Sequence, residues 1–170
     1  MPSAFLNNLG FVNLAKGVIN KNDTGHLMKA QTVFESANHL KSDTPGTLYG
    51  LTLATHFAGL NDQSIHWAEQ GIRITSDDPF MQLALGDALY ANDQSEEAIT
   101  QWRKSGSAPL LKIRAIAAER QLNWPLAEKW YTIYLRLQPQ DGNAIVQLAV
   151  IYPGVEGASK SYTIFLLKAN

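Results

Sequence analysis

The amino-acid sequence predicts an all-α protein, a solenoid of about five stacked helix pairs. Three observations support this prediction. A triplet of residues recurs at helical spacing, prolines follow the triplets at nearly constant distances, and the alternating apolar–polar runs typical of strands are scarce. The chain has 170 residues, which is long enough to bury a sizeable core within one domain.

Each triplet begins with a small residue, has a larger or apolar side chain four positions later, and has its third member at position seven. This spacing places all three residues on one face of a helix. The triplets are Ala30/Phe34/Ala37, Ala68/Ile72/Thr75, Ala98/Trp102/Ser105, Ala127/Tyr131/Tyr134 and Ala158/Tyr162/Phe165. Their leading alanines are 38, 30, 29 and 31 residues apart. The small residue lets a neighbouring backbone approach and the large one fills the next gap, so we expect a stack of similar units.

Proline and acidic residues mark the expected helix starts. The prolines that follow the first four triplets are Pro45, Pro79, Pro109 and Pro139. Because proline is tolerated in the first turn of a helix, each is expected to open the next pair. Asp78 and Asp141 are the expected N-caps, and Asp93 with Glu96 has the spacing of a capping box.

These boundaries predict a single domain. Its repeats are expected at about residues 3–43, 45–77, 79–107, 109–138 and 141–170. Polar turns inside a pair are expected at residues 61–63 and 92–94, and another at residues 152–157.

This pattern resembles the tetratricopeptide repeat (TPR) family, in which Leu-Gly is followed by Ala, an aromatic residue four positions later, and Pro. Leu85-Gly86, Ala98, Trp102 and Pro109 match that order. The resemblance covers essentially the whole chain and is strongest over residues 79–140. The period is about 30 rather than 34 residues. A first Leu-Gly twenty residues before Ala30 predicts a longer first helix or an insertion around residues 16–25.

The resemblance implies a right-handed α-α superhelix whose concave groove, lined by the first helix of each pair, binds a peptide or partner protein. The candidate groove residues are Asn7, Phe11, Thr52, His56, Asp87, Tyr90, Lys112, Ile116, Glu119 and, in the last pair, Val146. Tyr90 is the expected aromatic anchor. Packing against the core is the open alternative for that residue.

Motifs for catalysis or cofactors are missing from the sequence. It has no cysteine, no Gly-rich phosphate loop and no His-Glu-x-x-His motif. His66 and Glu69 lie three residues apart but have no third ligand in register. The net charge of -1 argues against a nucleic-acid partner. We therefore expect no enzyme activity, no cofactor and no metal, and we assign Trp102 to the core rather than to a stacking site.

Two hypotheses for function follow. The first is a protein-interaction scaffold. The second is the soluble tail of a bacterial membrane protein of envelope-glycan assembly, of the ligase or polymerase type, because residues 85–90 and 127–131 resemble such repeat tails. The compartment stays open between the cytoplasm and an extracytoplasmic domain. Residues 164–170 read as an apolar helix without a cap, so we expect a part of a larger protein, with self-association through that end.

Overall fold

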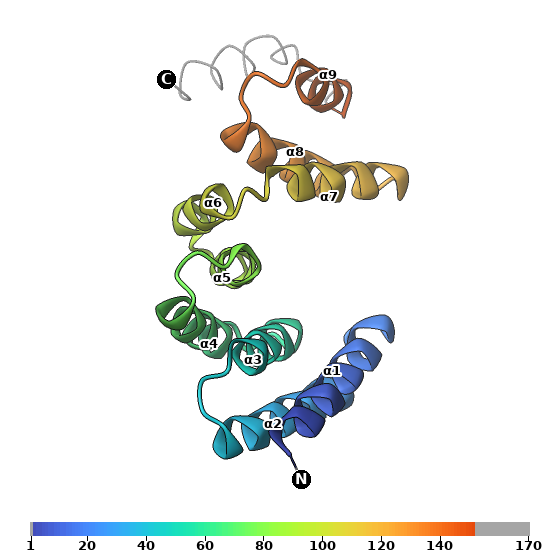
Figure 1. Cartoon of the computed structure of the whole chain (residues 1–170). Helices are drawn as coiled ribbons and strands as arrows, with labels where there is room; N and C mark the ends of the chain where they lie inside the picture. Colours follow the sequence, from blue (N-terminus) through green and yellow to red (C-terminus); the bar gives the residue numbers. More distant parts are fainter. Residues whose placement is uncertain (1, 152–170) are drawn as a thin grey trace. The chain divides into compact units, whose positions relative to one another are not determined.

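Every regular element in the described part of the chain is a helix, which confirms the all-α prediction (Figure 1). A computed structural model describes residues 2–151, and the predicted features at residues 152–170 lie outside them. The described residues divide into two compact units, unit 1 ending at Ser105 and unit 2 beginning at Gly106.

Unit 1 contains three helix pairs. Its helices are α1 (Ser3–Ile19), α2 (Thr24–Leu40), α3 (Pro45–Phe57), α4 (Asn61–Ile74), α5 (Pro79–Ala91) and α6 (Ser95–Lys104). Each helix packs on the next, and in addition α1 contacts α3 and α3 contacts α5. The first helices of the three pairs therefore lie side by side as one layer, which we call the first-helix layer (Figure 1).

The first pair is longer than the others. Helices α1 and α2 have 17 residues each, whereas α3 has 13 and α4 has 14. Only a short turn joins α1 to α2. The twenty residues between the first Leu-Gly and Ala30 therefore belong mostly to longer helices and not to an inserted segment.

Unit 2 begins with the pair α7 (Ala108–Arg120) and α8 (Trp124–Leu137), and α8 packs on α9 (Gly142–Ile151). Pro109 lies in the first turn of α7, as Pro45 and Pro79 do in α3 and α5. Pro139 instead lies in the turn that precedes α9.

Two of the three predicted helix caps are confirmed. The Asp78 carboxylate accepts hydrogen bonds from the backbone N–H of Phe80 and Met81 at 2.8 and 3.2 Å. Asp141 accepts one from Ala144 at 3.1 Å. Carboxylates at these positions satisfy N–H groups that have no partner within the helix.

The capping box at Asp93 and the polar turn at residues 61–63 are wrong. Asp93 has a positive φ of 60°, and the next residue, Gln94, is the N-cap of α6, with no side-chain cap. Helix α4 already begins at Asn61, so the turn lies just before it, at residues 58–60. The predicted turn at residues 92–94 is confirmed, since α5 ends at Ala91 and α6 begins at Ser95.

Large buried side chains pack on glycine in unit 1. The ring of Phe34 on α2 is fully buried and lies against both Gly10 of α1 and Gly50 of α3. Trp102 of α6 lies in the same way against Gly86 of α5, where an added Cβ would come within 2.6 Å of the indole. The absent side chain is what lets the helices approach this closely.

One backbone hydrogen bond repeats in three pairs and gives their true alignment. The N–H of Leu60, Gln94 and Asn123 each bonds to the carbonyl five residues earlier, at 2.9 Å. Counted from these residues, Ser64, Ala98 and Ala127 are equivalent, and so are Ala68, Trp102 and Tyr131.

The predicted register of α4 was therefore wrong by one turn. Ser64, Ala68 and Gly71 are its buried residues, and Ile72 is only half-buried. Position by position, Thr52 on α3 corresponds to Gly86 on α5. The second pair thus combines Thr52 with the small Ala68, where the third combines Gly86 with the large Trp102.

Candidate partner-binding surface

The predicted groove residues lie on the first helices, but one of them is inaccessible. Thr52 is fully buried, its hydroxyl donates to the Leu48 carbonyl at 2.9 Å, and its own carbonyl accepts from the Ser64 hydroxyl at 2.9 Å. The prediction for Thr52 is corrected, because a fully buried side chain is not available to a partner. The other candidates of unit 1 are half-buried: Asn7, Phe11, His56, Asp87 and Tyr90.

On α1, both candidates also contact neighbouring helices. The hydroxyl of Thr47 on α3 donates to the side-chain oxygen of Asn7 at 3.3 Å. Phe11 meets the buried ring of Phe34 edge to face, with the ring centroids 5.0 Å apart. These contacts hold the two side chains in place while part of each remains accessible.

On α5, Asp87 and Tyr90 both contact Trp102. The indole N–H donates to the Asp87 carboxylate at 3.0 Å, and the Tyr90 ring centroid lies 5.4 Å from the indole. Packing, the open alternative for Tyr90, is therefore present in the structure. It does not exclude binding, because the residue is only half-buried.

The same contact occurs in unit 2. Glu119 on α7 lies at the position equivalent to Tyr90, four residues before the N-cap of the second helix. Its carboxylate accepts a hydrogen bond of 2.8 Å from the hydroxyl of Tyr131, the residue equivalent to Trp102. Burial, followed by this bond, raises the pKa of Tyr131 well above its ordinary value. This position thus joins the two helices of a pair.

Lys112 is engaged within unit 2 as well. Its ammonium lies 2.6 Å from the Asp141 carboxylate and 5.5 Å from the centre of the Tyr134 ring. The Tyr134 hydroxyl donates to the same carboxylate at 2.5 Å. The hydrogen bonds from Lys112 and Tyr134 lower the pKa of Asp141, while burial and then the bond to Asp141 raise the pKa of Tyr134 to about 12. Because Asp141 also caps α9, this cluster fastens α9 to the α7–α8 pair.

The remaining candidates of unit 2 have no specific contact that defines a role. Ile116 on α7 is half-buried, and Val146 on α9 is exposed over 58% of its surface.

Side chains that could support chemistry are dispersed. Among residues 2–151, no three His, Cys, Asp or Glu side chains come together as metal ligands. His66 and Glu69 both lie on the exposed face of α4. Trp102 is completely buried, as predicted, whereas Trp124 is 45% exposed at the start of α8. No helix in this range is long and apolar enough to cross a membrane.

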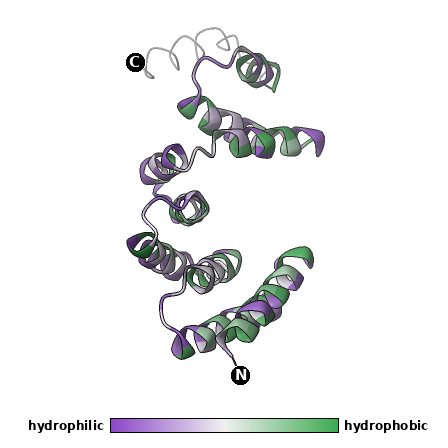
Figure 2. Cartoon of the chain, in the orientation of Figure 1, coloured by the Kyte–Doolittle hydropathy of each residue, from purple (hydrophilic) through white to green (hydrophobic). Residues whose placement is uncertain are grey.

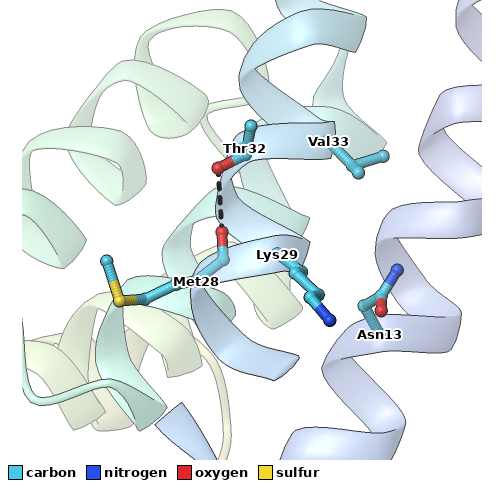
Figure 3. Close-up of a pocket in the computed structure, with 5 residues that line it drawn as sticks. All are labelled: Asn13, Met28, Lys29, Thr32 and Val33. Atoms are coloured by element: carbon cyan, nitrogen blue, oxygen red, sulfur yellow. Dashed lines mark hydrogen bonds between the residues drawn. The ribbon is translucent and has the colours of Figure 1, made fainter. Parts of the chain in front are cut away.

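Sequence reasoning missed a shallow groove between α1 and α2. It encloses about 320 Å³ and is lined mainly by apolar atoms of Asn13, Met28, Lys29, Thr32 and Val33 (Figure 3). One sequence signal was available, since α1 carries more apolar residues than a single buried face needs.

Comparison with known proteins identifies the fold and no family. No protein-family model matches the chain, and no curated protein matches it. A crystal structure of MamA protein superimposes with a TM-score of 0.58 at 15% sequence identity, covering 98% of this chain and 89% of that one. At this identity the likeness shows the fold alone, a TPR-like α-α solenoid.

Proposed function

We propose that this chain is a non-catalytic scaffold that binds a peptide or a segment of a partner protein on its first-helix layer. The observation that carries the proposal is the layer itself. In unit 1, α1, α3 and α5 lie side by side, and half-exposed side chains from helices far apart in the sequence belong to it. The likeness to MamA supports this class of function through the fold and says nothing about the partner.

Phe11 and Tyr90 are the proposed anchors. Each ring is half-exposed, and each rests on a fully buried aromatic side chain, Phe34 or Trp102. A ring that is already held in place loses little conformational entropy when a partner covers it, so it contributes more of its contact energy to binding. Asn7, His56 and Asp87 are proposed to supply the polar contacts around these anchors. On unit 2, Ile116 is proposed to contact a partner, with Lys112 and Glu119 beside it on α7.

The test is affinity capture from extract of the source organism, with the intact chain as bait. Phe11→Ala and Tyr90→Ala should each reduce the captured partner strongly. Lys104→Ala, at the exposed end of α6, is the matched control and should leave capture unchanged. Melting curves of all variants show whether the fold survives. Capture that persists in both aromatic variants, but is lost when exposed residues of second helices are changed, would place the interface elsewhere.

The second hypothesis, a tail of an envelope-glycan ligase or polymerase, is favoured by no feature of residues 2–151. The expected absence of nucleic-acid binding also stays a prediction from the balanced charge.

A further inference from the structure

We propose that α1 carries a second docking surface, on the side opposite the core, which binds an acidic amphipathic helix of a partner protein. This surface, the α1 outer face, consists of Phe5, Leu9, Val12, Lys16 and Ile19. It is separate from the anchors proposed above and does not depend on them.

The α1 outer face is an apolar stripe that contains one lysine. Its residues follow one another at intervals of four and three, so they lie on one side of the helix, opposite the buried Gly10, Leu14 and Gly17. Phe5 is 52% exposed, Leu9 38%, Val12 50% and Ile19 79%. Figure 2 shows hydrophobic residues along much of α1. A helix that is apolar on both sides is normally covered on both sides.

The packing of the neighbouring pairs indicates which kind of element covers such a face. Helix α3 packs against both helices of the first pair, and α5 packs against both helices of the second. Among the described helices, α2 and α3 are the ones that pack on α1, and neither covers its outer face. A helix laid along α1 would reproduce the packing that α3 and α5 already have, so the fitting occupant is helical.

The groove between α1 and α2 extends this surface. Asn13 lies one turn from Leu9 on α1, and Lys29 and Val33 of α2 line the opposite wall (Figure 3). With a volume of about 320 Å³, the groove has room for one large apolar side chain of the occupant. Amphipathic helices usually bind by laying their apolar face on a hydrophobic surface and inserting a large side chain into a groove.

The lysines of α1 and α2 favour an acidic occupant. Helix α1 contains no acidic residue, Lys16 lies within its stripe, and Lys29 lines the groove. No carboxylate of the described residues lies within ion-pair distance of Lys16 or Lys29. Residues 2–41 contain four lysines and two carboxylates, although the whole chain has a net charge of -1. Both carboxylates are engaged, Asp23 with His26 and Glu35 with Gln31.

A second copy of this chain is the less suitable occupant. Helix α1 offers its copy apolar side chains but no carboxylate to pair with Lys16. An amphipathic helix with glutamates beside its apolar stripe would satisfy both the stripe and the lysines.

The test measures binding of a defined probe to the intact chain by fluorescence anisotropy. The probe is a labelled amphipathic peptide of about 18 residues, long enough to form a helix, with leucines on one face and glutamates beside them. A matched peptide carries lysine in place of every glutamate. We expect the acidic peptide to bind, the basic one not to bind, and binding to weaken with added salt.

Three variants make the test specific. Val12→Glu should weaken binding of the acidic peptide at least about tenfold, because it places a like charge within the stripe. The double variant Lys16→Glu/Lys29→Glu should instead favour the basic peptide. Phe80→Glu changes an apolar residue of α5 that is 65% exposed, and it should have no effect. All the changed side chains are exposed, so melting temperatures should stay close to that of the unchanged chain.

Equal binding of the two peptides, unchanged binding by Val12→Glu, or an unchanged preference in the double lysine variant would each overturn the proposal. Sedimentation velocity tests the other occupant: a dimer that Val12→Glu dissociates would show that a second copy covers α1, and the proposal would be wrong. None of these results affects the proposed function, which is tested separately at Phe11 and Tyr90.

Discussion

Gly50 lies on α3 against the ring of Phe34, and its replacement by alanine tests how the first three helices are held together. A Cβ at Gly50 would fall well inside van der Waals contact of the Phe34 ring. The ring cannot move away easily, because Gly10 of α1 lies against the same ring atoms and a Cβ there would come within 2.6 Å of them. Phe11 also contacts this ring edge to face.

The expected loss of stability follows from two opposing effects. Alanine is more favourable than glycine inside a helix by about 1 kcal/mol. Overpacking a filled core costs roughly 1–3 kcal/mol, and the upper end applies here because the ring is held from several sides. Gly50→Ala should therefore lower the free energy of unfolding of unit 1 by about 2 kcal/mol.

Gly46→Ala is the matched control on the same helix. Its Cβ would lie 3.4 Å from the flexible amide of Asn7, an ordinary contact, so the change should be neutral or slightly stabilising. Combining Gly50→Ala with Phe34→Leu should remove most of the added cost, because leucine leaves the space that the methyl group needs.

Urea unfolding followed by circular dichroism measures all these variants, with each transition fitted separately if the two units unfold apart. Equal stability of Gly50→Ala and Gly46→Ala would refute the argument. So would a cost of Gly50→Ala that is as large in the Phe34→Leu protein as in the original one.

Trp102→Ala should lower the free energy of unfolding by about 3–5 kcal/mol, because the indole is completely buried. A change near zero, measured by urea unfolding, would contradict this packing. Glu119→Ala should destabilise unit 2 by about 1–3 kcal/mol, and Glu119→Gln by less, because glutamine still accepts from the Tyr131 hydroxyl. Equal losses would show that this bond does not matter. The pKa of Asp141 is lower in the folded state, so its contribution to stability is present above about pH 4 and lost as the pH falls through the folded-state pKa. The stability difference between the unchanged chain and Asp141→Asn should therefore be constant near neutral pH and narrow in acid, and a difference independent of pH would refute this.

Much of the fold could be predicted because its signals are local. The i, i+4, i+7 spacing of Ala98, Trp102 and Ser105 spans one helix and its C-cap, and the capping by Asp78 involves only the first turn of the helix that follows it. Such patterns depend on backbone geometry alone, so they can be read without knowledge of the neighbours.

The register of α4 could not be read in the same way. Ser64, Ala68 and Gly71 follow helical spacing as well as the predicted triplet does, and both begin with a small residue. The choice depends on contacts with α3, where the fully buried Thr52 accepts a hydrogen bond from Ser64 through its carbonyl. The same fact removed Thr52 from the candidate surface.

The sequence by itself determined that this chain is a stack of helix pairs and where prolines open several of them, whereas the longer helices of the first pair were one of two alternatives until the structure was known. The tertiary structure decided which side chains remain accessible. Tyr90 and Glu119 were candidate groove residues from the sequence, with packing left open for Tyr90, and in the structure each contacts the large residue of its partner helix. Conversely, the apolar Val12 is half exposed, because no described helix packs on that side of α1. Burial is a property of two surfaces in contact, so one helix's sequence specifies its apolar faces but not which of them is covered.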